Sequence, residues 1–301
     1  MITESLLRML IAIHKHQPIT GNVLALGKQS IVISPKKILA LFKEQNCEVN
    51  PNGIAHLGKK DNETRHRQKE SIDDQVFFNL FSDVKYDTMD VSTYENASII
   101  HDLNYPVPPE LEEKFDFIID GGTFDHLFDI KTAFANITKM LKPNGRIFQW
   151  NAASNFANAA YLSFSADFFH DYFVLNKFAD CRTFFAESYS MSAQNWCLYE
   201  FIPPANNRSY PLFRASPFTS MVLVYAKKTQ DTTCNRMPIQ LQYRDKELLA
   251  EYTNNKAAYS ESSFSISRPK FHKLALPLRH RIMHSLIQDP CRKTYKYHGW
   301  L

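Results

Sequence analysis

The segment from residue 115 to residue 150 constrains the fold of this chain more than any other part of the sequence. The apolar run 115–120 predicts a buried strand, and Gly121 and Gly122 end it. Residues 124–141 then repeat apolar side chains at helical spacing until Lys142-Pro-Asn-Gly145 stops the pattern. Residues 146–150 predict a second strand. A strand, a long helix and a second strand form a right-handed crossover, which requires a parallel sheet.

Further apolar runs continue the alternation on both sides of this unit. Residues 23–26, 86–91 and 97–101 predict strands, and Ser34 followed by Pro35 marks the start of a helix between the first two. Two later β-prone segments, 181–185 and 221–225, are expected to pair antiparallel at the sheet edge. The pattern predicts an α/β fold, a doubly wound and mainly parallel Rossmann-like sheet with an antiparallel edge strand.

Composition divides the chain into two parts. Residues 1–230 carry the predicted Rossmann-like domain, in which the polar stretch 46–71 is an insertion or a lid. Residues 231–301 are expected to form a helical, basic C-terminal extension, since Asp289 is the single acid among many Lys and Arg side chains in 268–301. This tail is expected to dock on the domain or to mediate oligomerisation. A membrane-binding amphipathic helix is the alternative, which Pro277 disfavours.

The bulk composition narrows the possible functions. A formal charge of +4 on 301 residues gives no reason to expect nucleic acid as a main partner. The 5 cysteines are widely spaced without a CxxC or Cys/His pattern, so we expect reduced thiols, no metal site and a cytoplasmic protein. The apolar stretch 3–14 is too short to be a transmembrane segment, and it predicts a packed amphipathic helix.

Polar or small residues follow four of the predicted strands. Ligands of parallel sheets bind beyond the carboxyl ends of the strands, so the informative segments are 27–30, 90–92, 101–104 and 120–123. One carboxylate after the second strand can accept two hydrogen bonds from a ribose diol, and Asp90 occupies that position. A nucleotide-like cofactor is therefore expected along this edge. The first strand is not followed by a GxGxxG motif, which disfavours a nicotinamide cofactor.

These segments resemble the class I methyltransferases that use S-adenosylmethionine (SAM). The resemblance covers about residues 20–180 and is carried, in order, by segments 23–29, 90–97, 101–104, 115–126 and 140–145. The chain is most similar to a bacterial subgroup with a Leu-Gly-[Lys/Arg]-Gln first turn and unassigned substrates. The resemblance implies SAM as the cofactor and a small-molecule or sugar-like (glycan-like) methyl acceptor.

The resemblance also implies cofactor contacts along the strand ends. The amino-acid end of SAM would lie against Gly27, the backbone of Lys28 and Gln29, Asp120 and Gly121. The ribose hydroxyls would be held by Asp90, and the adenine by Asp102 and the backbone of Leu103. For Asp90 and Asp102 the alternative is a role in capping a turn.

The resemblance places Asp125 and His126 on the side of the methyl acceptor. His126 is the candidate general base, because imidazole titrates near neutrality. A structural role remains the alternative for both residues, and for Asp125 the helix dipole favours it. The loop after Trp150 and the stretch 46–71 are further candidates for acceptor contacts.

The first turn departs from the family pattern. Members commonly carry an acid two residues before the first glycine, and this acid binds the SAM amino group, whereas this chain has Ala25. Lys28, Gln29 and Ser30 also replace the usual flexible glycines. These departures leave a second interpretation open, a non-catalytic methyltransferase-like binding or scaffolding protein with a degenerate cofactor loop.

Overall fold

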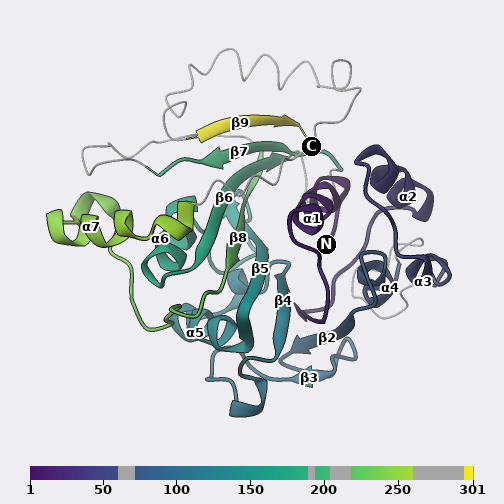
Figure 1. The fold of residues 1–301 in the computed structure, drawn as a ribbon, viewed down its shortest axis with the longest axis horizontal. Helices are drawn as coiled ribbons and strands as arrows, with labels where there is room; N and C mark the ends of the chain where they lie inside the picture. Colours follow the sequence, from purple (N-terminus) through teal and green to yellow (C-terminus); the bar gives the residue numbers. More distant parts are fainter. Residues whose placement is uncertain (60–71, 189–193, 204–217, 260–294, 301) are drawn as a thin grey trace.

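The structure is a computed structural model that describes residues 1–59, 72–188, 194–203, 218–259 and 295–300. Nine strands of these residues form one sheet in the order β3-β2-β1-β4-β5-β8-β6-β7-β9 (Figure 1). Five neighbouring strands run parallel, namely β3 (Ile99–Ile100), β2 (Lys85–Asp90), β1 (Asn22–Leu26), β4 (Phe115–Asp120) and β5 (Leu141–Ser154). The other four continue antiparallel, namely β8 (Thr219–Lys227), β6 (Ala179–Ser188), β7 (Cys197–Phe201) and β9 (Tyr295–Trp300).

This arrangement confirms the predicted Rossmann-like α/β fold with a parallel sheet and an antiparallel edge. The expected antiparallel pair is present, because Arg182 of β6 pairs with Tyr225 of β8. The antiparallel part is larger than one edge strand, since β7 and β9 extend it. Strand β9 comes from the segment that composition assigns to the C-terminal extension, yet it pairs with β7. The division at residue 230 stays a prediction, and residues 260–294 lie outside the described part.

Helices cover both faces of the sheet and enclose two cores (Figure 1). Alternation along β1 separates them, because Val23 and Ala25 belong to one core and Leu24 and Leu26 to the other. The first core includes side chains of α1 (Glu4–His16), α2 (Pro35–Glu44) and α4 (Asp74–Asn79). The second includes side chains of α5 (Ile130–Met140), α6 (Ala166–Leu175) and α7 (Lys246–Asn254).

Two predicted helical segments differ in their details. The N-terminal helix forms as expected, and α1 is buried on all sides over residues 5–13, with its apolar side chains in the first core. The helix expected from residue 124 begins only at Ile130, where the Asp129 side chain accepts a hydrogen bond from Thr132 N at 2.9 Å and caps it. Residues 124–126 form a separate 3₁₀ turn, η2 (Phe124–His126). Within the described ranges, no helix combines the length and apolar character that a membrane crossing needs.

The predicted insertion at 46–71 is described up to residue 59. It contains the short helix α3 (Pro51–Ile54), which packs close to the end of α4. Asn50 caps α3 and also donates to the carbonyl of Asn79 at 2.9 Å. This first part of the stretch is therefore attached to the domain, and residues 60–71 lie outside the described part.

Candidate functional site

The carboxyl ends of the parallel strands bring the predicted cofactor residues to one edge of the sheet. Leu26, the last residue of β1, pairs with Asp120 of β4 and with Met89 of β2. Asp90, the last residue of β2, pairs with Ile100 of β3. The turns that follow these strands are therefore neighbours, as expected for a ligand site of this fold class.

The turn after β1 is bonded to both neighbouring strands. Gly27 N donates to the carbonyl of Met89 at 2.8 Å, and Thr123 Oγ1 donates to the carbonyl of Leu26 at 2.8 Å. Gly27 has φ of +71°, a left-handed conformation that a glycine adopts without steric cost. A turn held from both sides in this way has a fixed position for its carbonyl groups.

The side chain of Gln29 occupies the space between the turn after β1 and Gly121 of the turn after β4, a space that we call the crevice. It is 2% exposed, and Nε2 donates to the carbonyls of Gly27 at 3.0 Å and Leu26 at 3.3 Å. Its Oε1 is buried without a hydrogen-bond partner. A Cβ on Gly121 would lie 2.1 Å from this oxygen, so a glycine at 121 leaves room for the carboxamide. The sequence predicts a role only for the Gln29 backbone, and this packing of the side chain is not predicted.

Asp74, for which the sequence analysis has no functional role, anchors the same turn. Its Oδ2 accepts from Gln29 N at 3.0 Å and from the Tyr86 hydroxyl at 2.8 Å. Burial raises the pKa of this carboxyl, and the charge of Lys28 opposes that rise. One sequence feature could have indicated this role, namely the two consecutive acids at residues 73–74. Asp73 alone caps α4, so Asp74 is left for another contact.

Asp120 is buried, and both of its oxygens are bonded within the protein. Oδ1 accepts from Gly122 N at 3.1 Å and Thr123 N at 2.7 Å, and Oδ2 accepts from Asn151 Nδ2 at 2.9 Å. Burial raises the pKa of Asp120 to about 6. These contacts make Asp120 a brace for the 121–123 turn, and they leave the backbone of Gly121 as the group that faces the crevice.

The other end of the row is open to solvent. Asp90 Oδ1 accepts from Ser92 N at 3.2 Å, and Asp102 Oδ1 accepts from Asn104 N at 2.9 Å. The Oδ2 atoms of both acids have no hydrogen-bond partner among the described residues. Leu103 is buried, and its carbonyl accepts from Asn136 Nδ2 at 3.1 Å. Both acids therefore cap turns through Oδ1, as the alternative interpretation predicts. Oδ2 of each acid stays available to a ligand.

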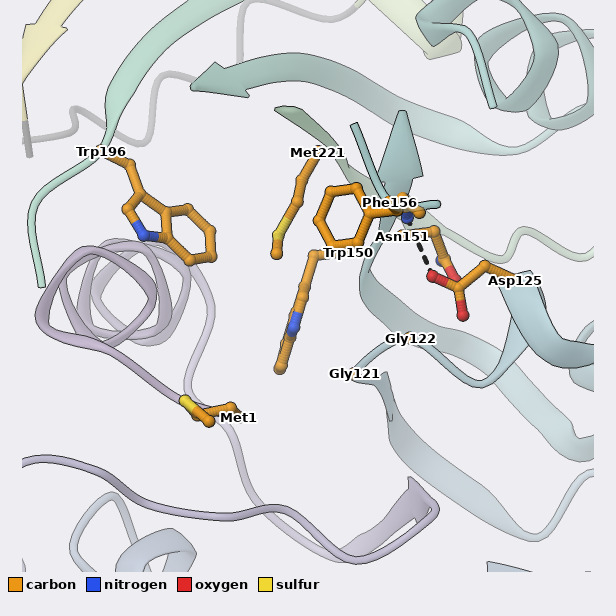
Figure 2. A pocket seen from close by; sticks show the side chains of 10 residues that line it. Met1, Gly121, Gly122, Asp125, Trp150, Asn151, Phe156, Trp196 and Met221 are labelled. Carbon is orange, nitrogen blue, oxygen red and sulfur yellow. Dashed lines mark hydrogen bonds between the residues drawn. The ribbon is translucent and has the colours of Figure 1, made fainter. Parts of the chain in front are cut away.

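A small cavity lies beside Gly121 and Gly122 of the turn after β4 (Figure 2). Its volume is about 30 Å³, enough for one or two water-sized groups. It is lined by Met1, Gly121, Gly122, Asp125, Trp150, Asn151, Ala152, Phe156, Trp196 and Met221. Residues 150–152 belong to this lining, whereas the described part of 46–71 does not. A role of either segment in binding a methyl acceptor stays a prediction.

Asp125 and His126 both lie on η2 but face different surroundings. Asp125 is 6% exposed and lines the cavity, with Oδ2 accepting from Ala152 N at 3.0 Å and Oδ1 lacking a hydrogen-bond partner. Burial raises the pKa of Asp125 to about 6. The His126 side chain is 58% exposed, is not part of the lining, and places Nε2 3.5 Å from Asp125 Oδ1. The geometry thus puts Asp125, rather than the predicted base His126, at the cavity.

The two ends of the row differ in how they fit SAM. The open Oδ2 atoms of Asp90 and Asp102 suit hydroxyl and amine donors of a nucleoside. The buried Gln29 Oε1 is an orphaned acceptor that suits an ammonium group and could replace the acid missing at Ala25. The Gln29 carboxamide must share or leave the crevice for an amino-acid moiety to enter. Among the described residues, no group of three or more His, Cys, Asp or Glu side chains could hold a metal.

No protein-family model matches this chain, and a search of curated proteins gives no match either. Solved structures align with it at low similarity. The 1,6-didemethyltoxoflavin-N1-methyltransferase of Burkholderia thailandensis, with its bound 1,6-didemethyltoxoflavin and S-adenosylhomocysteine, is 13% identical over 75% of this chain and 78% of that chain, with a TM-score of 0.35. A Thermotoga maritima SAM-dependent methyltransferase, a possible histamine N-methyltransferase, is 12% identical over 75% and 89%, again with a TM-score of 0.35.

Other alignments cover about half of the neighbour. Phosphoethanolamine N-methyltransferase 2 of Haemonchus contortus is 10% identical over 74% of this chain and 52% of that chain, with a TM-score of 0.38. The methyltransferase domain of the citrinin polyketide synthase is matched over 47% of its length. At this level of similarity, the choice of a function rests on the geometry of the site.

Proposed function

We propose that this chain is a SAM-dependent methyltransferase acting on a small-molecule or sugar-like acceptor. The observation that carries the proposal is the row of ligand-facing groups along one sheet edge, from Asp102 and Asp90 to the turn at Gly27, ending beside the cavity at Asp125. A nucleoside end, an amino-acid end and an acceptor end follow one another in the order that a SAM-linked transfer needs.

Each residue has a defined part in this proposal. Asp90 Oδ2 accepts from the ribose hydroxyls, and Asp102 Oδ2 accepts from the adenine amine. The fixed turn at Gly27 and the backbone of Gly121 border the amino-acid moiety, with Gln29 Oε1 as the acceptor for its amino group. Lys28 and the Leu103 backbone complete the predicted contacts. When bound, SAM supplies an electrophilic methyl group.

Orientation accounts for most of the catalysis that the protein would provide. Displacement at a methyl carbon requires the acceptor atom in line with the leaving group, and holding two reactants in that geometry removes much of the barrier. Asp125 is the group proposed to take a proton from the acceptor, while the exposed His126 side chain lies outside the cavity lining. The leading role given to Asp125 differs from the expectation that His126 is the base.

Calorimetric titration of the full chain with SAM and with S-adenosylhomocysteine tests the proposal. Saturable binding, with a rise in the unfolding temperature, is expected. An absence of both heat and thermal shift at millimolar SAM would overturn the proposal and favour the non-catalytic binding protein, in which Gln29 permanently fills the crevice. A cytoplasmic location and the exclusion of nucleic acid as a partner remain predictions.

A further inference from the structure

The small cavity beside Gly122 has an unusual chemical lining (Figure 2). Three aromatic side chains (Trp150, Phe156 and Trp196) and the Met221 side chain belong to its lining. Among the described residues that line it, Asp125 alone has an ionisable side chain. Aromatic faces carry a negative potential that attracts cations, so the rings and the carboxylate favour the same sign of ligand charge.

The buried polar atoms of this lining that lack a hydrogen-bond partner are both acceptors. They are Asp125 Oδ1 and Asn151 Oδ1, on residues that are 6% and 1% exposed. The orientation of the Asn151 amide is fixed, because its Nδ2 donates to Asp120 Oδ2 and a carboxylate only accepts. A buried acceptor without a donor costs free energy, so a ligand with several donors would gain by satisfying both.

The surroundings supply little positive charge to this carboxylate. None of the described residues that line the cavity is Lys or Arg. His126 Nε2 lies 3.5 Å from Asp125 Oδ1, but that side chain is mostly exposed and approaches from outside the lining. Met1 also lines the cavity, and burial lowers the pKa of its amino group to about 6, so this group carries little charge at pH 7.

We infer that the cavity binds the protonated nitrogen of a small primary or secondary amine. An ammonium group offers up to three donors for the two orphaned oxygens, whereas a hydroxyl offers one. A volume of about 30 Å³ admits such a head group, with the rest of the molecule leaving through the opening. The inference that this amine is the methyl acceptor rests on the proposed function. In that case Asp125 takes a proton from the bound ammonium, the freed nitrogen lone pair forms the bond to the methyl carbon, and the cofactor sulfur leaves with the electrons of the bond that breaks. It narrows the small-molecule acceptor to an amine and disfavours a sugar.

Titration of the full chain with n-butylamine, and with 1-butanol as an uncharged probe of the same length, tests the binding without SAM. Binding is followed by tryptophan fluorescence, since Trp150 and Trp196 line the cavity. A saturable change is expected with the amine and not with the alcohol. Asp125→Asn should lower the amine affinity about 10-fold to 100-fold, the usual range for losing a charged hydrogen-bond partner.

The Asp125→Asn variant should fold, because its new Oδ1 can still accept from Ala152 N. Asp129→Asn is the matched control, since it neutralises a nearby acid outside the lining and keeps a good helix cap. It should bind the amine as the wild type does. Equal binding of 1-butanol, no amine binding, or amine binding unaffected by Asp125→Asn would each overturn the inference.

A separate SAM titration distinguishes this inference from the proposed function. SAM binding without amine binding would leave the methyltransferase proposal standing and reject the amine. Amine binding without SAM binding would reject methyl transfer and keep the cavity as an amine site.

Discussion

The two ends of the candidate cofactor site differ in how much of their bonding the protein itself satisfies. At the β2–β3 end, Asp90 and Asp102 each use one oxygen in a local turn and leave the other open. At the β1–β4 end, Gln29 fills the crevice, and Asp120 has both oxygens bonded within the protein. The first end is available to a ligand as it stands. At the β1–β4 end, a ligand can bind only if the Gln29 side chain moves or if the ligand uses Gln29 Oε1 as its sole acceptor.

This difference separates residues that the fold needs from residues that a ligand would need. Asp120 and Gln29 hold turns together, so changing them alters the stability of the protein first. Asp90 and Asp102 lie at the surface of the same edge, so changing them alters ligand affinity first. A strand-end position alone does not distinguish the two groups, because both follow parallel strands at the same edge.

The largest expected effect tests Asp120 as a brace. Its folded pKa of about 6 lies above the ordinary 3.8, so the folded state holds the proton more tightly than the unfolded state. This group therefore stabilises the fold more below pH 4 than above pH 6, and the difference amounts to about 3 kcal/mol. Asp120→Asn should remove this part of the pH dependence and leave the protein more stable than the wild type at pH 7.

The substitution suits the local bonding. The new Asn oxygen can accept from Gly122 N and Thr123 N. Its amide nitrogen can donate to Asn151 Oδ1 once the Asn151 amide turns over, since Nδ2 of Asn151 now faces residue 120. Chemical denaturation of both proteins between pH 4 and pH 7 provides the measurement. A variant that is less stable at pH 7 would show that the charge of Asp120 is required by the fold.

The next largest effect tests the open end. Asp90→Ala should lower SAM affinity about 10-fold to 100-fold, because two hydrogen bonds to a charged group are lost. The free energy of unfolding should fall by about 1 kcal/mol, the value of the single hydrogen bond from Ser92 N that is lost with the side chain. Calorimetry and thermal unfolding measure the two quantities. Asp87→Ala, an acid earlier on β2, is the control, and equal SAM affinity in both variants would contradict the ribose role.

A smaller effect tests the filled crevice. Gly121→Ala would put a Cβ 2.1 Å from Gln29 Oε1 and displace the carboxamide from its two carbonyl partners. The expected loss is about 1–2 kcal/mol of unfolding free energy, the value of two neutral hydrogen bonds. In a Gln29→Ala background the same substitution should cost close to nothing, which a double-mutant cycle measures. Gly58→Ala is the control, since nothing lies near its added Cβ.

The parallel half of the fold, and the gathering of its strand ends at one sheet edge, could be predicted from the sequence. Apolar runs that end at Leu26, Asp90 and Asp120 mark buried strands, and chain order then places their carboxyl ends at one edge. The filling of the crevice could not be predicted. Gln29 contacts Gly121 only because β1 pairs with β4, and that contact depends on side-chain packing that residue types do not specify.

The antiparallel half of the sheet is harder to predict, because its pairing joins segments that lie far apart in the chain. The expected pairing of β6 with β8 follows from two β-prone segments, but β7 is short, and β9 joins it from a distant part of the chain that composition marks as basic. The break before α5 was also missed. Leu127 and Ile130 continue a helical spacing, whereas the Asp125 side chain accepts from Ala152 N across the turn and Asp129 caps the helix that follows.

The smallest expected effect is that of replacing His126, the exposed neighbour of the buried Asp125. Exposed ion pairs contribute little, so His126→Gln should change the unfolding free energy by about 0.5 kcal/mol or less and leave SAM affinity unchanged. Calorimetry and denaturation would measure this. If the variant also retains methyl transfer, Asp125 is the group that serves the acceptor. If transfer is lost while binding and stability persist, His126 is the base despite its exposure, and the cavity carboxylate only orients it.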